Sequence, residues 1–261
     1  ISAFDVIMNE VVPSKGIILN NLSAFWFNQL ANTKTHFVSK GENFDFSKYT
    51  NFQDLDKKIL QRSTVVKKAK RIDMECVVRG YITGSAWVEY KNKGTINEML
   101  LPQGILEAQR FEKPIFTPST KASEGHDEPL SYNAGKKLIG DKLYEQLEEI
   151  SIDLYIKAHD FCENKGIILA DTKFEFGIID NEIILIDEVL TPDSSRFWKK
   201  DDYSEGNSPN PYDKQFLRDW LNKQDWNKTP PPPAIPNEVI KNTLDRYLEI
   251  YELLTNDKLN I

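Results

Sequence analysis

Residues 167–198 carry the clearest alternation of apolar and polar positions in the chain. Two isoleucine-rich runs flank Asp180 and Asn181, a turn-forming pair, and this pattern predicts a β-hairpin. Successive side chains of the first run point to opposite faces of the strand. The charged face holds Asp171, Lys173 and Glu175, and the other face holds Thr172, Phe174 and Phe176. Because charge beside an apolar core is costly to bury, this strand is expected to line a cleft.

The length of the hairpin loop decides whether Asp187, on the second run, can meet Glu175. A two-residue loop at 180–181 places Asp187 on the apolar face, whereas a three-residue loop at 179–181 places it diagonal to Glu175. We predict the three-residue loop, because that register brings two hard oxygen ligands together for a magnesium ion that carries phosphates. A surface hairpin with a solvated ladder of charges is the alternative.

The rest of the chain mixes helices and strands. Strands are expected at 65–67 and 74–81, and a short helix near 54–60. Helices with an apolar stripe are expected at 21–31, at 141–164 behind the hairpin sheet, at 212–221, and from Asn237 onward after an extended proline-rich connector at 229–236.

A Gly-Ser turn after the strand at 74–81 suggests an anion site. Ser85 is expected to cap a helix at 86–93 that Gly94 ends, and a helix N-terminus presents free N–H groups. Capping alone accounts for Ser85, and a strand-end salt bridge accounts for Arg79. Arg196, held between Ser195 and bulky aromatic residues, suits bidentate contact with a carboxylate or phosphate.

The polar loop at 116–129 is too long for a simple connector, and such loops often carry function. It offers hydroxyl, ammonium, imidazole and carboxylate groups from Ser119, Thr120, Lys121, His126 and Asp127. The His–Asp pair is weak evidence for catalysis, and no serine or cysteine pattern supports a hydrolase triad.

Composition narrows the function classes. With 261 residues, of which 40% are hydrophobic, the chain can bury a core and form two subdomains. A net charge of −7 argues against a general nucleic-acid binder, and no apolar run reaches membrane-spanning length. Cys76 and Cys162 lack metal-type spacing and suit reduced thiols in a cytoplasmic protein. Oligomeric state is left undecided.

Two stretches, IDMECVVRGYITGS and LADTKFEFG, resemble the signature motifs of the SAICAR synthetase family of purine biosynthesis, and DEVLTPDSSRFW and FTPSTKA extend the match. The likeness covers the whole chain and is greatest to the longer, yeast-like members. It implies an α/β (α+β) fold with antiparallel sheets and packed helices. Residues 1–75 would form a small nucleotide-binding subdomain similar to a kinase N-lobe, and residues 76–261 a larger ATP-grasp-like subdomain, with a hinge around 73–76.

The resemblance also implies an activity and its residues. A family member joins the carboxylate of carboxyaminoimidazole ribonucleotide (CAIR) to the amine of L-aspartate, using ATP and Mg²⁺, through an acyl phosphate. Residues expected to hold Mg-ATP are Lys15, Glu75, Glu175 and Asp187, the last two as metal ligands. Residues expected to bind the ribonucleotide or line the reacting end are Arg79, Ser85, Ser119, Thr120, Lys121 and Arg196. The expected catalytic residues are Lys173, which offsets charge at the transferred phosphoryl group, and Asp127 or Asp171, which takes the amine proton.

One departure from the family pattern concerns the start of the sequence. Family members open with a basic segment of the form GKxRDxY, whose lysine and arginine reach the nucleotide phosphates, and this sequence starts after it. We expect either that upstream residues are missing from the sequence or that the polypeptide is shortened. A truly shortened protein should bind ATP weakly, which leaves a non-catalytic nucleotide-binding module as the alternative function. A kinase-like phosphotransferase is a third hypothesis.

Overall fold

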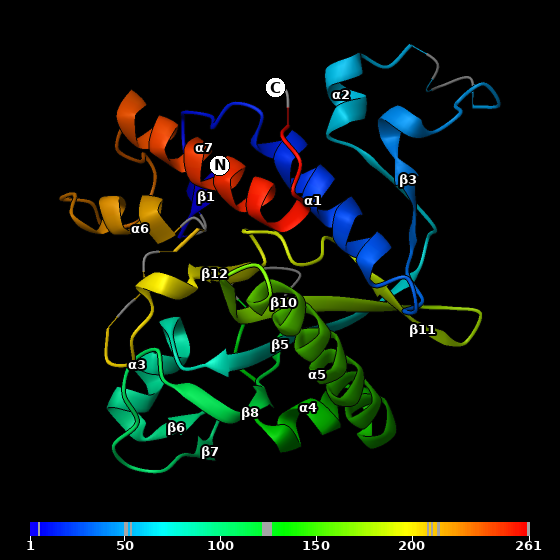
Figure 1. The fold of residues 1–261 in the computed structure, drawn as a ribbon. Helices are drawn as coiled ribbons and strands as arrows, with labels where there is room; N and C mark the ends of the chain where they lie inside the picture. Colours follow the sequence, from blue (N-terminus) through cyan, green and yellow to red (C-terminus); the bar gives the residue numbers. More distant parts are fainter. Residues whose placement is uncertain are drawn as a thin grey trace.

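The computed structural model describes residues 1–261 except 5, 50, 51, 53, 122–126, 208, 210, 213, 214, 260 and 261. Its centre is a six-stranded antiparallel sheet in the order β11-β10-β5-β8, with β12 paired to β10 and β9 paired to β5 (Figure 1). The strands are β5 (Lys70–Tyr81), β8 (Arg110–Phe116), β9 (Ser119–Thr120), β10 (Ile167–Ile179), β11 (Glu182–Ile186) and β12 (Ser195–Lys199).

Alternation along β10 separates the core from the polar side of this sheet. Phe174 and Phe176 are buried in the main core, where α5 (Asp141–Glu163) contributes Leu154 and Ala158. The predicted long helix behind the hairpin sheet is therefore confirmed, with α4 (Tyr132–Ile139) packed beside it. Burying these aromatic side chains removes apolar area from water and so stabilises the sheet.

Helices α1 (Lys15–Gln29) and α7 (Asn237–Thr255) pack against each other (Figure 1), and Phe25 and Trp26 of α1 also contact Phe161 of α5. The first of these helices begins six residues earlier than the predicted residue 21. Its opening turns are rich in isoleucine, which favours strands, but Ile18 is fully buried against the core. Tertiary packing thus overrides local propensity at this helix.

The remaining elements are short. The strands are β1 (Ser2–Ala3), β2 (Val6–Ile7), β3 (Phe37–Lys40), β4 (Thr64–Val66), β6 (Thr95–Ile96) and β7 (Met99–Leu100). The helices are η1 (Gly41–Asn43), α2 (Lys57–Gln61), α3 (Gly84–Lys93), η3 (Lys200–Asp202) and α6 (Gln215–Asn222). A second apolar cluster ties α6 to the N-terminal strands and to α7 through Ala3, Val6, Leu217, Leu221 and Val239.

The hairpin register differs from the prediction. Ile179 pairs with Glu182, so the loop consists of Asp180 and Asn181 alone, and the predicted three-residue loop is wrong. Both loop residues have positive φ, 51° and 63°, as in the two-residue turns that match the twist of antiparallel strands. The local turn chemistry therefore decided the register.

The expected cap of α3 is also wrong. The helix begins at Gly84 with Thr83 as the N-cap residue, so Ser85 lies in the first turn and does not cap it. The predicted end is confirmed, because Gly94 adopts the left-handed conformation at the C-cap. Ser85 is thereby released for other contacts.

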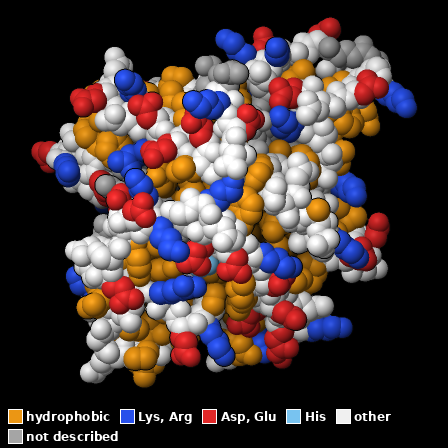
Figure 2. Space-filling view, in the orientation of Figure 1, with side chains coloured by type: hydrophobic (Ala, Val, Ile, Leu, Met, Phe, Trp, Pro, Cys, Tyr) orange, Lys and Arg blue, Asp and Glu red, His pale blue; other side chains and the backbone are white. Residues whose placement is uncertain are grey.

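The expected division between residues 75 and 76 falls within the continuous strand β5 and stays a prediction. Cys76 and Cys162 are both unpaired and buried. Among the described residues, no helix is long and apolar enough to cross a membrane. Figure 2 shows acidic and basic side chains interspersed over the visible face.

Candidate active site

Three neighbouring strands place charged side chains on one face of the sheet. Asp171 of β10 lies opposite Arg79 of β5 on one side and opposite Arg196 of β12 on the other. Further along, Glu175 lies opposite Glu75. Because directly opposite residues share a face, these side chains form a polar floor on the side of the sheet away from Phe174.

Asp171 holds two guanidinium groups. Arg79 donates from Nη1 to Asp171 Oδ2 at 3.0 Å and from Nε to Thr117 Oγ1 at 2.9 Å, while Arg196 donates to the same Oδ2 atom. Burial lowers the pKa of Arg79, although the Asp171 carboxylate opposes that shift, and arginine stays charged in proteins. One carboxylate shared by two arginines leaves a net positive charge at the floor, which suits an anion.

The N-terminus of α3 closes against this pair. Gly84 has a φ of +58°, and a Cβ atom there would lie 2.5 Å from Nη2 of Arg196. Glycine therefore permits both the turn and the close approach of the guanidinium. Ser85, in the first turn of this helix, lines the same cleft, and the first N–H groups of a helix have no partner within it. This end of the cleft combines two arginines with a helix N-terminus.

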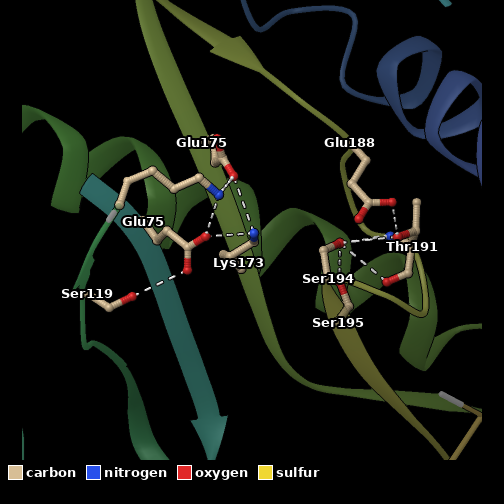
Figure 3. A network of polar contacts seen from close by, with 9 residues as sticks. Glu75, Ser119, Lys173, Glu175, Glu188, Thr191, Ser194 and Ser195 are labelled. Carbon is tan, nitrogen blue, oxygen red and sulfur yellow. Dashed lines mark hydrogen bonds and ion pairs between the residues drawn. The ribbon is translucent and has the colours of Figure 1, made fainter. Parts of the chain in front are cut away.

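A second group of charges lies further along β10 (Figure 3). Lys173 Nζ donates to Glu75 at 2.8 Å and to Glu175 at 3.3 Å, and Lys121 Nζ donates to the same two carboxylates at 2.9 and 2.8 Å. Ser119 Oγ donates to Glu75 at 3.4 Å. The sequence motifs around these residues are far apart in the chain, and strands β5, β9 and β10 bring them together.

The pKa values in this group reflect burial and mutual attraction. Burial raises the pKa of Glu175, but the hydrogen bond from Lys121 and the charge of Lys173 outweigh it, so the net shift is downward. Burial likewise lowers the pKa of Lys173, and Glu75 and Glu175 reverse that effect. The lysines are therefore held as cations and the carboxyl group of Glu175 as an anion.

Asp187 reaches Glu175 despite the two-residue hairpin loop. Strand β11 ends at Ile186, and Asp187 takes a positive φ of 63°, which turns its side chain out of the strand alternation. Burial, followed by the charge of Glu175, raises the pKa of Asp187, and the two carboxyl groups share a hydrogen bond. A buried carboxyl group, Glu175, beside an exposed one, Asp187, offers the hard oxygen donors that Mg²⁺ prefers, so these residues fit the implied ion.

The turn that leads to Arg196 is fixed by its own hydroxyl groups. Thr191 Oγ1 donates to Glu188 at 2.7 Å, and its backbone N–H donates to Ser194 Oγ at 3.2 Å (Figure 3). The Ser195 hydroxyl is hydrogen-bonded to Thr172 of β10 at 2.8 Å. These contacts fix the position at which β12 begins and thereby the position of the Arg196 backbone.

Asp193, in the same turn, connects it to two helices. Lys15, the first residue of α1, forms an ion pair with Asp193 Oδ2, and the hydroxyl of Tyr247 in α7 donates to Oδ1 at 2.6 Å. Lys15 was expected to bind Mg-ATP, and the structure gives it this positioning contact with the turn. Its nucleotide role stays a prediction.

These side chains line a cleft of about 490 Å³. Of the sequence-predicted residues, the cleft lining includes Glu75, Arg79, Ser85, Lys121, Asp127, Asp171, Lys173 and Arg196. Thr120 is not part of the lining, and its hydroxyl accepts a hydrogen bond from the Glu128 N–H at 2.9 Å. His126 lies outside the described residues.

A second cavity of about 330 Å³ adjoins Asp187 and Glu188. Its other walls come from α1 and from the β3–β4 region, including Leu19, Phe27, His36 and Val66. Asp187 therefore lines this cavity, and its carboxyl group interacts with that of Glu175. Glu175 in turn forms ion pairs with Lys121 and Lys173, which line the first cleft. The pair of carboxyl groups stands between an apolar pocket and a cationic one.

Sequence reasoning missed several cleft residues: Thr172, Asp193, Ser194, Ser195 and Arg218. Ser194 and Asp193 lie in the TPDSSR stretch beside Arg196, and that proximity could have identified them as candidate cleft residues. Arg218 belongs to the predicted short C-terminal helix, where no sequence signal indicates which cavity the helix faces.

The polar floor, the paired carboxyl groups and the cationic cleft define an α/β protein that binds small anionic ligands. The SAICAR synthetase family model matches residues 1–233, and the chain belongs to that family. It is 47% identical over 256 residues to phosphoribosylaminoimidazole-succinocarboxamide synthase of Geobacter sulfurreducens, covering 98% of this chain and 86% of that protein.

Solved structures agree with this assignment. The SAICAR synthase of Saccharomyces cerevisiae complexed with SAICAR has a TM-score of 0.89 and 45% identity, covering 100% of this chain and 88% of that one. A SAICAR synthetase in complex with ADP has a TM-score of 0.71 and 26% identity, covering 100% of this chain and 89% of that one. The predicted family and the mixed α/β fold are confirmed.

Proposed function

We propose that this protein is an ATP-dependent ligase that joins the carboxylate of CAIR to the amine of L-aspartate, giving SAICAR, ADP and phosphate. Membership of the family supports the overall reaction. The observation that carries the residue-level proposal is the pairing of Arg79 and Arg196 on Asp171 beside the lysine–glutamate group.

The chemistry requires an activated carboxyl group, because a carboxylate is a poor acylating agent. The γ-phosphoryl group of ATP is transferred to the carboxylate of CAIR, giving an acyl phosphate and ADP. The amine of L-aspartate then attacks the acyl carbon, the C–N bond forms, and phosphate leaves as the amine loses its proton. Both steps bring anions together, so fixed cations are needed at the reacting end.

Each group of charges receives one part of this task. Arg79, Arg196 and the α3 N-terminus with Ser85 bind the phosphate of the ribonucleotide. Lys173 and Lys121 offset negative charge during phosphoryl transfer. The apolar cavity next to Asp187 accepts the nucleotide base.

Glu175 and Asp187 would hold Mg²⁺, which offsets charge on the triphosphate when it is bound. Two neighbouring carboxyl groups support this assignment, since the charge of Glu175 contributes to the raised pKa of Asp187. A divalent cation between them would remove that repulsion.

We assign Asp127 as the group that accepts the proton of the attacking amine. Oδ2 of Asp171 already accepts hydrogen bonds from both Arg79 and Arg196, so this carboxylate is engaged in holding the two guanidinium groups. Asp127 is an exposed carboxylate that lines the same cleft. A cytoplasmic location is part of the proposal and is supported by the unpaired Cys76 and Cys162.

An omission assay tests the function. The full chain is incubated with ATP, Mg²⁺, CAIR and L-aspartate, and ADP release is measured with each component left out in turn. Sustained ADP release that requires both CAIR and L-aspartate, with formation of the amide, supports the ligase. Sustained ADP release without L-aspartate would indicate a phosphotransferase, and binding without turnover would indicate a non-catalytic module.

A further inference from the structure

The cations that line the cleft differ in their partners. Arg79 and Arg196 are paired with Asp171, and Lys121 and Lys173 are paired with the glutamates. Arg218, from α6, lines the same cleft, and among the described residues its guanidinium has no hydrogen-bond or ion-pair partner. Its Nε atom is buried without an acceptor.

The position of Arg218 is set by the packing of its helix. Leu217 and Leu221 of α6 are each only 1% exposed and pack with Ala3 and Val6 of the N-terminal strands. This anchoring fixes which side of α6 faces the cleft. Because a buried N–H of a charged group is costly without an acceptor, Arg218 is expected to gain its partner from a ligand.

The three substrates of the proposed reaction contact different cationic side chains of the cleft. The Arg79–Arg196 pair takes the ribonucleotide phosphate, and the lysine–glutamate group takes the triphosphate and the reacting carboxylate. L-Aspartate brings two carboxylates that do not react, and these need a cation of their own. Arg218 is the remaining guanidinium in the lining, and its planar fork suits a carboxylate.

We infer that Arg218 binds a carboxylate of the amino-acid substrate and thereby gives the enzyme its affinity for L-aspartate. The inference rests on the proposed function, because it assigns a residue to the second substrate of that reaction. Arg218 would contact the substrate directly and take no part in transfer of the phosphoryl group.

The test compares substrate dependence in variants of the full chain. In Arg218→Gln, the KM for L-aspartate should rise roughly 10- to 100-fold, as expected for loss of a hydrogen-bonded charge. The KM values for CAIR and ATP should stay within about two-fold of those of the unmodified protein, because their cations are untouched. Arg218→Lys, which keeps the charge and loses the fork, should recover part of the loss.

Lys223→Gln is the matched control, since Lys223 is an exposed cation just after the same helix and does not line the cleft. It should leave all three KM values unchanged. If circular dichroism shows that Arg218→Gln does not fold, Arg218→Met keeps the aliphatic stem and carries the same expectation.

L-Asparagine identifies which carboxylate is bound. If Arg218 contacts the side-chain carboxylate, the preference in kcat/KM for L-aspartate over L-asparagine falls in Arg218→Gln by the same factor as the affinity. If it contacts the α-carboxylate, the preference is retained while both amino acids bind more weakly.

The outcomes separate the inference from the proposed function. Failure of the unmodified full-length protein to form the amide would refute the function itself. Normal turnover by the unmodified protein, with an unchanged L-aspartate KM in Arg218→Gln, overturns the inference alone. A rise confined to the KM of CAIR also overturns it, because Arg218 would then serve the phosphate end.

Discussion

Replacing Gly84 by alanine tests whether the α3 turn sets the position of Arg196. The added Cβ atom would lie 2.5 Å from Nη2 of Arg196, so the guanidinium must move by about 1 Å to reach the 3.4 Å of ordinary contact. A displacement of that size disturbs the ion pair with Asp171 and the proposed phosphate site together. The φ of +58° adds a strain of about 1–2 kcal/mol for a residue with a side chain.

The two effects can be measured separately. Strain should lower the free energy of unfolding by about 1–2 kcal/mol in denaturant titrations. Displacement of Arg196 should raise the KM for CAIR roughly 10- to 100-fold at saturating ATP and L-aspartate. The KM for ATP should change little, because Glu175 and Asp187 are on another part of the sheet.

Gly94→Ala is the matched control. Gly94 ends the same helix with a φ of +70°, and a Cβ atom there would meet nothing within 4 Å. It should lose similar stability and retain the KM for CAIR. Equal CAIR KM values in the two variants would refute the idea that Gly84 is needed for the placement of Arg196.

Three further predictions concern separate parts of the protein. Glu175→Gln should lower kcat/KM for Mg-ATP by about 100-fold with little loss of fold, because one charged oxygen ligand is gone, as steady-state kinetics and circular dichroism can show. Arg196→Ala should chiefly raise the KM for CAIR, by roughly 10- to 100-fold in the same assay. His159→Gln should make stability less sensitive to acid. Burial, with the charge of Arg110, lowers the pKa of His159, so its stabilising effect is complete above about pH 6.5 and is lost as the pH falls.

Each of these expectations has a contrary result. An unchanged rate in Glu175→Gln would remove Glu175 from the metal site. An unchanged CAIR KM in Arg196→Ala would argue against a substrate role for that arginine. For His159, unfolding free energies at pH 7.5 and 5.5 should differ less in the variant than in the unmodified protein. Parallel pH profiles would contradict the assignment.

The sequence predicted the elements that have strong periodicity. The alternation in β10 and the apolar stripe of α5 each follow directly from side-chain spacing, and the structure confirms both. The family resemblance supplied most of the cleft residues, including Glu75 and Lys121, which lie together only because β5 and β9 pair. The family motifs therefore indicated which residues, distant in the sequence, lie close together in the fold, and the local pattern of apolar and polar positions does not contain this information.

The errors arose where backbone geometry depends on one residue. The register argument assumed that Asp187 continues the strand alternation, and its left-handed conformation breaks that assumption. Asp187 therefore meets Glu175 with the loop length that the turn residues favour. Arg218 was missed for a different reason, since its place in the cleft follows from how α6 packs on the N-terminal strands.

The ion pair and hydrogen bond of Asp193 determine when, during synthesis, the protein becomes able to bind CAIR. Its carboxylate joins Lys15 to Tyr247, which the ribosome adds more than 200 residues later. A nascent chain that has not yet released α7 lacks the contact that Tyr247 makes with the turn before Arg196. Ribosome-bound intermediates should therefore bind CAIR poorly, and full affinity should be acquired only when the C-terminal helix docks.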